Sequence, residues 1–391
     1  MDYWVTAMLF TIRSLSPKER EVIDRINQMR EMLRSNLRQP RRWTGLLRRA
    51  TFARAIQGSN SIEGYNVSTE DAIAAVENEE PTLDPNTETW RAILGYRRAM
   101  TYVLQLANDP YFSYSETLIK SLHFMMLDYD MAKHPGSWRP GWIAVRNEPS
   151  GLVVYEGPDV EQVPALMHEL IESLNAPDGM PLLIRGALAH INLAMIHPFS
   201  DGNGRMARCL QSLVLAREKI LEPEFCSIEE YLGANTQAYY DVLAEVGAGT
   251  WHPERDAHPW IRFILTAHFH QAHTLLRRLQ RAERLWTELE KLQKAHQFPE
   301  RMIFALFDAA LGFKVRNPLY RSAADVSLNL ASRDLAHLAE IGLLMPHGEK
   351  RGRYYVATPK IAEIYRLERN RERRSEEDPF AESAPMLPGM S

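Results

Sequence analysis

The sequence lacks several features that would narrow its class at once. Only two of its 391 residues are cysteine, Cys209 and Cys226, so no disulfide framework can hold the fold together. No apolar run reaches the roughly 18 residues that a membrane-spanning helix needs, and the N-terminal apolar run has no basic segment before it. A formal net charge of -4 gives no whole-chain attraction to nucleic acid or to an anionic membrane. We therefore expect a cytoplasmic protein with no membrane partner.

The residues that are present follow the pattern of a mostly helical protein. With 45% hydrophobic and 25% charged residues, the chain has an ordinary globular composition and is long enough for two or three domains. Apolar side chains recur at spacings of three and four from Pro17 to about Leu37, which predicts an amphipathic helix. Similar patterns predict helices over 44–64, 88–107, 114–127, 182–196, 204–217, 231–246 and 258–297. The fold class is therefore expected to be mainly α.

Two stretches depart from the helical pattern. Residues 142–157 contain two apolar β-type runs around "RNEPSG", which predicts a β-hairpin. Beyond the boundary at Phe298-Pro299, helical segments at 299–310, 322–326 and 331–344 precede a strand, a basic turn and a second strand. Three helices followed by a hairpin is the order of a winged helix-turn-helix domain. From Asn370 the chain is charged and then rich in proline and serine, so we expect a disordered tail.

The stretch "HPFSDGNGRMAR", residues 197–208, combines glycines and arginines in a way that suits a phosphate-bearing substrate. Gly202 and Gly204 can adopt positive φ, so that consecutive backbone N–H groups point into one concavity at the positive end of a new helix. Arg205 and Arg208 lie three residues apart and therefore share a helical face, where they can hold separate phosphate oxygens. The spacing predicts a phosphate cradle.

Two other residues of this stretch have functional groups suited to a reaction at phosphorus. Pro198 breaks the helix directly after His197, and an imidazole there can accept a proton from a hydroxyl that attacks a phosphate. Asp201, beside the cradle, can bind Mg²⁺, which combines a few carboxylates with phosphate oxygens of the substrate. Each residue alone is commonplace in structural turns. Their combination at this spacing points to a site for chemistry on phosphate.

The same stretch resembles the signature of Fic-domain proteins, HPFx[D/E]GNGRxxR, at every defining position. The resemblance covers about residues 45–265 and implies a helical core that transfers AMP from ATP to a hydroxyl side chain of a target protein. It implies that His197 is the general base, that Asp201 binds Mg²⁺ and that Phe199 anchors the loop in the core. The nucleotide site that it implies consists of Gly202, Asn203, Gly204, Arg205 and Arg208.

Two further stretches fit the same family. The hairpin at 142–157 resembles the flap of Fic proteins, which aligns a target segment by backbone β-pairing. Tyr239 and Tyr240 fall where family members place aromatic side chains around the adenine, and the resemblance implies that role here. Adjacent tyrosines on a helix are also ordinary neighbours in a core and at a surface. Both interpretations of the tyrosine pair remain open from the sequence.

An inhibitory motif precedes the core. "SNSIEG", residues 59–64, fits the family pattern [S/T]xxxE[G/N], with Ser59, Glu63 and Gly64 at the defining positions. The resemblance implies that Arg208 meets the γ-phosphate of ATP, and a carboxylate aimed at Arg208 would occupy that cation. The position of the motif implies the class of Fic proteins with an N-terminal inhibitory helix. The same glutamate can instead position a water for removing AMP from a modified protein, and the sequence does not separate the two directions.

Four regions are expected: an N-terminal helical region with the inhibitory motif (1–110), a Fic core (111–285), a winged-helix domain (298–366) and the tail (370–391). The basic residues of the third region suit DNA phosphates, while protein contacts, including a homodimer, are an equal alternative. These basic residues are Arg333, Lys350, Arg351 and Arg353.

Other functions are weaker alternatives. Another phosphate-containing group could be transferred through the same loop. A DNA-binding regulator that uses the Fic core as a nucleotide sensor is the alternative from a different class, although a sensor needs no base such as His197. A metal site at His268, His270 and His273 is not favoured, because His268 and His270 face different sides of a helix and no carboxylate joins them.

Overall fold

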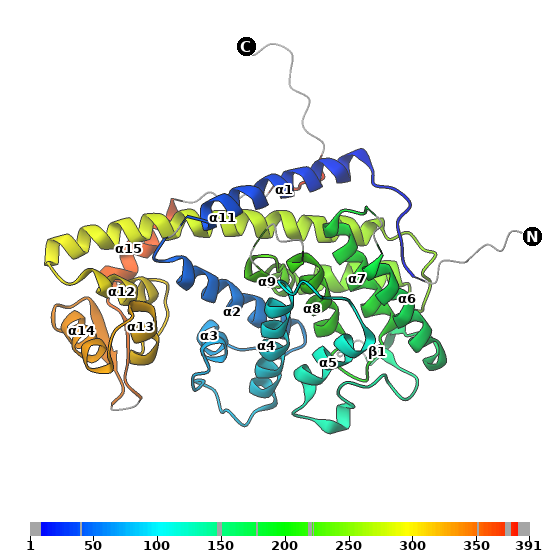
Figure 1. Cartoon of the computed structure of the whole chain (residues 1–391), viewed down its shortest axis with the longest axis horizontal. Helices are drawn as coiled ribbons and strands as arrows, with labels where there is room; N and C mark the ends of the chain where they lie inside the picture. Colours follow the sequence, from blue (N-terminus) through cyan, green and yellow to red (C-terminus); the bar gives the residue numbers. More distant parts are fainter. Residues whose placement is uncertain are drawn as a thin grey trace, which may run out of the picture.

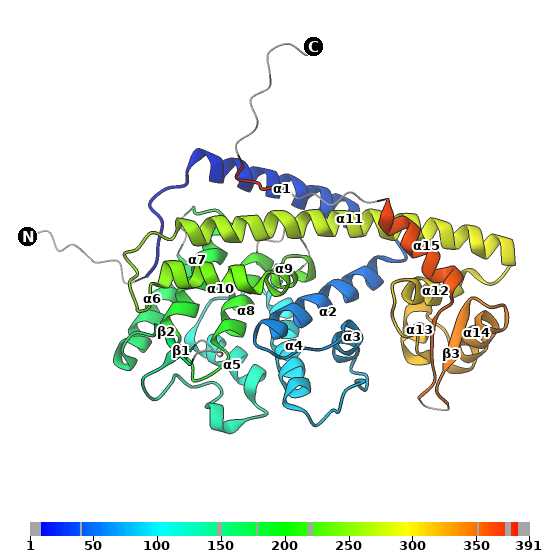
Figure 2. The same cartoon turned by 180° about the vertical axis from the view of Figure 1, so that it is seen from behind.

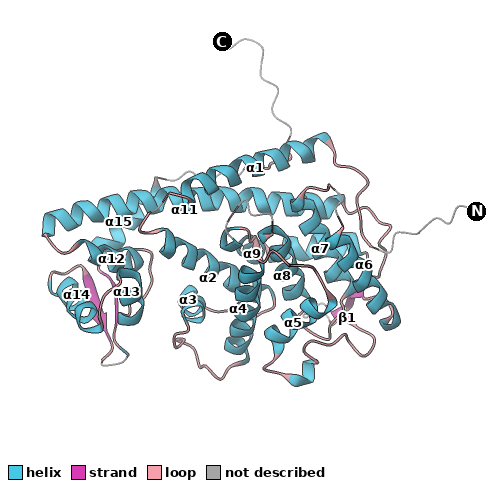
Figure 3. Cartoon of the chain, in the orientation of Figure 1, coloured by secondary structure: helices cyan, strands magenta, loops and turns pink. Residues whose placement is uncertain are grey.

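The structure is a computed structural model that describes residues 9–39, 41–146, 151–176, 179–217, 221, 223–349, 352–371 and 377–381. Helices dominate these residues, which confirms the expected fold class. Strands appear in the described part of the chain as two short hairpins (Figure 3). The strands are β1 (Ala144–Arg146), β2 (Val153–Glu156), β3 (Leu344–His347) and β4 (Tyr354–Ala357).

The helices follow one another through the chain with short connections. Those before the signature stretch are α1 (Pro17–Leu37), α2 (Thr44–Ile62), α3 (Thr69–Glu77), α4 (Glu88–Leu106), α5 (Glu116–Leu127), α6 (Val163–Asn175) and α7 (Leu182–Ile196). Those after it are α8 (Asn203–Ala216), α9 (Glu229–Ala234), α10 (Thr236–Gly247), α11 (His258–His296), α12 (Ile303–Ala310), α13 (Asn317–Ala324), α14 (Leu328–Glu340) and α15 (Pro359–Asn370). A short 3₁₀ turn, η1 (Met131–Lys133), follows α5.

Helix α11, which is 39 residues long, forms the spine of the molecule. Helix α1 packs along it, α2 to α10 form a central lobe on one side, and residues 298–370 form a C-terminal module near its far end (Figure 1). The view from behind shows α2 lying between the central lobe and the C-terminal module (Figure 2). One long helix thus connects the two parts, and α2 faces both.

The centre of the lobe is the pair α7 and α8, which pack against each other. Almost every side chain of α7 is buried, because the helix is apolar on nearly all sides. The turn between α7 and α8 holds the signature stretch. The most enclosed part of the lobe therefore positions the candidate site.

Helix ends follow local capping rules. Ser16 caps α1: its hydroxyl accepts a hydrogen bond from the Glu19 N–H (3.2 Å), and the Glu19 carboxylate accepts one from the Ser16 N–H (2.7 Å). Helix α2 ends with Glu63 at its cap and Gly64 at φ 81°, the left-handed conformation that ends many helices at glycine. Gly64 therefore stops α2 directly after Glu63.

Three expectations about secondary structure were wrong in detail. The single helix expected over 231–246 is split at Asn235 into α9 and α10. The second helix after residue 298 is α13, which lies mostly before the expected 322–326. Helix α15 was not expected, and it extends the C-terminal module to Asn370 by packing on α11 and α12. Periodicity alone missed the split and α15 because tertiary packing decides such short segments.

Some expectations concern residues outside the described part of the chain. These are the tip of the hairpin at 147–150, Lys350 and Arg351 of the basic turn, and most of the tail expected at 370–391. Among the described residues, no helix is long and apolar enough to cross a membrane.

Candidate active site

The turn between α7 and α8 is held in shape by its own side chains. His197 ends α7 in the left-handed conformation (φ 51°), with its N–H bonded to the Leu193 carbonyl (3.1 Å). The Asn203 side chain accepts from the Phe199 N–H (2.9 Å) and donates to the Phe199 carbonyl (2.8 Å). Phe199 is fully buried and stacks on the His123 ring, with 3.7 Å between the ring centroids. Hydrogen bonds and packing within the loop therefore fix its shape.

Each glycine of the turn sits where a larger residue would not fit. Gly202 has φ 77°, and a Cβ there would also lie 2.9 Å from the Leu127 side chain. A Cβ on Gly204 would collide with the Glu63 carboxylate and come within 3.2 Å of Arg208 Nη1. Both glycines thus keep open the space in front of the first turn of α8, where backbone N–H groups have no partner within the helix.

The two arginines of α8 are buried, each with only 1% of its surface exposed. Arg208 donates from Nε to Ser59 Oγ (2.8 Å) and from Nη2 to the Ser59 carbonyl (3.0 Å) and Glu63 Oε1 (2.6 Å). Three donor groups, Nε and Nη1 of Arg205 and Nη1 of Arg208, are buried without a hydrogen-bond partner. A buried donor without a hydrogen bond destabilises a folded protein unless a ligand accepts that hydrogen bond.

In the structure Ser59 and Glu63 both contact Arg208, and the contact between Glu63 and Arg208 is the one that the inhibitory motif predicts. Glu63 lies at the end of α2 with a quarter of its side chain exposed, and it forms an ion pair with Arg208 across 145 residues of sequence. Burial alone would lower the pKa of Arg208, but the Glu63 carboxylate outweighs burial and holds that pKa above its ordinary value. The guanidinium is thus charged and already has an anion.

Asp201 faces cations from two elements. Its Oδ1 accepts from the Gly202 N–H (2.6 Å), and its Oδ2 lies 3.0 Å from Lys133 Nζ and 3.8 Å from Arg205 Nη2. Burial would raise the pKa of Asp201, but Arg205 and Lys133 outweigh it and lower that pKa. The carboxylate is therefore ionised, and about a third of it is exposed toward the mouth of the cradle.

A short chain of contacts joins Asp201 to the residue that follows the inhibitory motif. Lys133 also binds Glu88 (2.6 Å), and Glu88 accepts from the Tyr65 hydroxyl (3.0 Å). The Tyr65 ring lies 5.2 Å from the Arg205 guanidinium. None of these three residues belongs to a motif, since they come from η1, the start of α4 and the loop after α2.

The imidazole of His197 has a defined tautomer. Its Nδ1 lies 3.1 Å from the Ala194 carbonyl, which can only accept, so Nδ1 carries the proton in the neutral ring. Nε2 then has a free lone pair. Burial, helped by the positive charge of Arg139, lowers the pKa of His197 below its ordinary value. A neutral imidazole with an available Nε2 is the form that a general base requires.

Two residues outside the signature hold the loop in place. Arg139 donates from Nε to the His197 carbonyl (3.0 Å), and its backbone N–H donates to the Pro198 carbonyl (2.8 Å). His123 accepts from the Gly136 N–H at Nδ1 and donates from Nε2 to the Asp201 carbonyl (2.9 Å each), while burial lowers its pKa to about 4. The sequence analysis missed both roles, although Arg139 stands in "GSWRPGW", just before the predicted hairpin.

The predicted hairpin forms from β1 and β2, which pair antiparallel. It is fixed to the lobe by the Tyr155 hydroxyl, which donates to the Met195 carbonyl (2.7 Å), and by the Glu156 N–H, which donates to Gly249 (2.8 Å). Val153 and Val154 are exposed. Its base is thus anchored close to the end of α7, two residues before His197.

The two tyrosines occupy different environments. Tyr239 is buried in the core, where its hydroxyl donates to His190 Nε2 (2.9 Å). Tyr240 is 44% exposed, and its hydroxyl donates to the Ile62 carbonyl (2.8 Å) at the last turn of α2. The structure therefore gives Tyr240 a contact with helix α2, and a role of either ring at adenine stays a prediction.

The residues considered as metal ligands, Asp201 and the histidines of α11, lie in different environments. The described residues contain no cluster of three or more His, Cys, Asp or Glu that could hold a metal ion. His268 is buried beside Gln211, whereas the His270 ring stacks on Tyr231. Asp201 thus offers one carboxylate, which fits Mg²⁺ only when phosphate oxygens complete its ligands.

A buried helix, a rigid glycine turn and a second helix with two incompletely paired arginines define an α-helical protein with an anion cradle. Residues 113–215 match the Fic/DOC family, and the chain contains a domain of that family. The signature stretch lies inside the matched range.

Relatives and solved structures agree with this domain assignment. The chain is 25% identical over 259 residues to "Protein adenylyltransferase Fic" of Nematostella vectensis, a match that covers 63% of this chain and 53% of the relative. It is 24% identical over 170 residues to a probable protein adenylyltransferase of Aquifex aeolicus, covering 42% of this chain and 51% of the relative. The chain spans about half the length of these curated relatives.

Two solved structures have the same fold. A Fic family protein from Desulfovibrio desulfuricans aligns with TM-score 0.56 and 22% identity, over 88% of this chain and 97% of that one. Fic-1 from C. elegans aligns with TM-score 0.53 and 21% identity, over 68% of this chain and 74% of that one. At these identities the likeness concerns the fold.

Proposed function

We propose that the protein is an autoinhibited protein adenylyltransferase that transfers AMP from ATP to a hydroxyl side chain of a target protein. One observation carries the proposal: buried donor atoms of Arg205 and Arg208 have no partner, and these arginines lie on the helix that follows the turn with a neutral His197 and a free Nε2. Buried cationic donors without partners favour a polyanion, and the adjacent base favours a reaction at it rather than simple binding. Relatives named protein adenylyltransferase support the same reaction class.

In this mechanism the residues of the chain position reactants and move one proton. The hydroxyl oxygen of the target attacks the α-phosphorus of ATP, and His197 Nε2 takes the hydroxyl proton. The bond between the α-phosphorus and its bridging oxygen to the β-phosphate breaks, and the electron pair leaves with pyrophosphate. The target keeps AMP as a phosphodiester. Arg139 and the Ala194 carbonyl hold the His197 loop and ring in the required orientation.

The phosphate site has two kinds of donor. The first-turn N–H groups of α8, behind Gly202 and Gly204, supply backbone donors at the positive end of a helix. Arg205 and Arg208 supply charged donors, and Arg208 is the one implied to meet the γ-phosphate. Asn203 does not donate to the phosphates in this proposal. Its side-chain amide is hydrogen-bonded to the backbone of Phe199 and therefore shapes the turn.

Mg²⁺ would be held by Asp201 together with phosphate oxygens of ATP. The ion would neutralise phosphate charge and favour departure of pyrophosphate. Lys133 forms an ion pair with Asp201, so the carboxylate also has a cation partner within the protein.

The proposed inhibition, called the brake below, comes from the ion pair between Glu63 and Arg208. The carboxylate occupies Nη2 and lies against Gly204, so that a γ-phosphate bound there would meet a negative charge. ATP would then bind weakly or in a non-productive pose. The anchored β1–β2 hairpin is the proposed docking strand for the target segment, through its backbone groups.

The C-terminal module is proposed to be a winged helix that contacts DNA. Arg333 and Arg353, the two described residues of the expected basic set, are both exposed and support this. A gel-shift series at increasing salt tests it: binding that weakens with salt supports DNA as the partner, and no binding at low salt excludes it.

The proposed reaction is tested with ATP labelled on either the α- or the γ-phosphate. The Glu63→Gly variant should become labelled on itself or on added lysate proteins from α-labelled ATP alone, and His197→Ala in that background should not. Label retained from the γ-position would show phosphoryl transfer, and no label from either substrate would contradict the proposal.

A further inference from the structure

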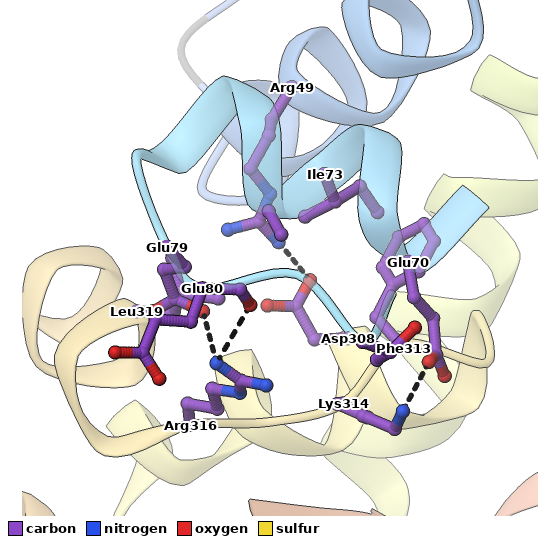
Figure 4. Close-up of a pocket in the computed structure, with 12 residues that line it drawn as sticks. Arg49, Glu70, Ile73, Glu79, Glu80, Asp308, Phe313, Lys314, Arg316 and Leu319 are labelled. Carbon is purple, nitrogen blue, oxygen red and sulfur yellow. Dashed lines mark hydrogen bonds and ion pairs between the residues drawn. The ribbon is translucent and has the colours of Figure 1, made fainter. Parts of the chain in front are cut away.

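Helices α2 and α3 form a hairpin with the inhibitory Glu63 near its turn. Helix α2 ends at Ile62, Gly64 reverses the chain, and α3 starts at Thr69. The two helices pack against each other. The α2–α3 hairpin contacts the C-terminal module through Arg49 near the start of α2 and through Glu70 and Ile73 of α3 (Figure 4). The brake is therefore held between two different parts of the molecule.

An apolar cluster joins the α2–α3 hairpin to the C-terminal module. Phe313, which is 5% exposed, packs with Ala50 and Ala53 of α2 and with Ala72 and Ile73 of α3. The small alanines let the chain after α12 approach both helices closely. Burying a phenylalanine side chain typically contributes about 2 kcal/mol, so this contact favours the docked arrangement.

Ion pairs surround that cluster. Arg49 of α2 donates to Asp308 of α12 (2.6 Å), and both side chains are at least 90% buried. Lys314 lies 2.5 Å from Glu70 in the first turn of α3. Arg316 lies 3.5 Å from Glu79, just beyond the end of α3. Figure 4 shows these pairs side by side, with cations and anions supplied from both parts. The charges therefore match along the whole contact.

The contacting segment is also part of the C-terminal sheet. Val315 exchanges two backbone hydrogen bonds with Tyr355 of β4 (2.8 and 2.9 Å), and Lys314 Nζ lies 5.0 Å from the centre of the Tyr354 ring. Residues 313–316 thus join the β3–β4 hairpin on one side and the α2–α3 hairpin on the other. A shift of β4 would therefore also move Phe313 and the ion pair of Lys314 with Glu70.

We infer that the C-terminal module acts as a clamp that keeps the α2–α3 hairpin, and with it Glu63, in the inhibitory position. This inference rests on the proposed function, because it assigns a control element to that brake. Arg49 and Glu63 belong to one helix and its cap, so a tilt of α2 at Arg49 is transmitted roughly 20 Å to Glu63. A partner that binds the module and loosens this contact would release Arg208, and by reciprocity nucleotide binding at Arg208 would loosen the contact.

Charge reversal at the partly exposed pair of Lys314 and Glu70 tests the clamp in the full-length protein. Lys314→Glu places two carboxylates opposite each other, Glu70→Lys places two ammonium groups opposite each other, and the double variant restores attraction with reversed sign. Hydrogen exchange of residues 56–67 is measured without nucleotide, and labelling from α-labelled ATP is measured in parallel. Each single variant should raise both the exchange rate and the labelling about fivefold, and the double variant should return both toward the wild type.

Two controls separate a clamp from general destabilisation. Lys291→Glu makes the same change at an exposed pair with Glu288 on α11 and should alter neither readout. In the Glu63→Gly background, Lys314→Glu should add no labelling, because no brake is left to release. If Lys314→Glu lowers the melting temperature more than Lys291→Glu does, Arg316→Gln takes its place, since its side chain is also partly exposed.

The outcomes are distinct for the clamp and for the reaction. Unchanged exchange of residues 56–67 in the single variants, or equal activation with and without Glu63, would overturn the clamp. A Glu63→Gly variant that transfers no label at all would overturn the proposed reaction, and the exchange measurements would still decide whether the module holds the hairpin.

Discussion

The signature stretch and the C-terminal module both place arginines beside carboxylates, but the two regions pair them differently. In the module, Arg301 makes two hydrogen bonds to Asp334 (2.7 and 2.8 Å), and the Tyr320 hydroxyl donates to the same carboxylate (2.8 Å). On α8, Arg205 and Arg208 leave three buried donor groups without partners. Arg301 is thus held by two hydrogen bonds to one carboxylate, whereas Arg205 and Arg208 keep buried donors that the protein does not bond.

This difference separates a structural ion pair from a ligand site. An unpaired buried donor destabilises the fold by about 1–3 kcal/mol, so two such arginines side by side favour a site for an anionic partner that is not part of the chain. The arrangement of Glu63 fits the same logic, because it supplies a removable anion to Arg208 while leaving Nη1 unpaired. The fully paired Arg301 needs no such explanation.

The largest expected effect is the loss of the base. In the Glu63→Gly background, His197→Ala should lower AMP transfer by about 100-fold or more, since general base catalysis typically contributes that much. Transfer is measured with α-labelled ATP. His168→Ala removes an exposed histidine of α6 and is the matched control, expected to leave transfer unchanged. Comparable activity of the His197 and His168 variants would contradict the assignment.

The next effect concerns Arg208, whose Nη1 has no partner. Arg208→Ala in the Glu63→Gly background should weaken ATP binding about tenfold or more, because it removes a charged donor from the phosphates. Calorimetric titration with ATP measures it. Arg333→Ala, which removes an exposed arginine of the module, should not change ATP affinity. If both substitutions act equally, the comparison between the two regions fails.

A pH profile sharpens the role of His197. Since burial lowers the pKa of His197, the ring stays neutral below its ordinary value of 6.5 and can accept a proton there. We expect kcat/KM of the Glu63→Gly variant to be constant near neutral pH and to fall only as pH drops through a value below 6.5. A fall centred clearly above 6.5 would mean that another group titrates.

The smallest effect is expected in the module. Tyr320→Phe removes one of three hydrogen bonds to Asp334 and should lower the free energy of unfolding by about 1–2 kcal/mol. The melting temperature measures this loss. AMP transfer by the Glu63→Gly variant should be unaffected, because this bond belongs to the paired region. A large loss of transfer would show that the module contributes to the reaction itself.

The sequence predicted the signature turn well because its residues are contiguous. The expected helix 182–196 is α7, and the glycines and arginines of 202–208 lie together, as their spacing required. Lys133, Glu88 and Tyr65 could not be predicted, since they come from separate elements that meet only in the folded lobe. The contact between Arg49 and Asp308 joins residues 259 positions apart, and no local pattern marks it.

The most direct test of the central claim is a crystal structure of the Glu63→Gly variant with ATP and Mg²⁺. We predict that the triphosphate lies in the turn between α7 and α8, with phosphate oxygens on the unpaired donors of Arg205 and Arg208 and with His197 Nε2 facing the α-phosphate. A triphosphate bound elsewhere, or one that leaves those donors unpaired, would contradict the account.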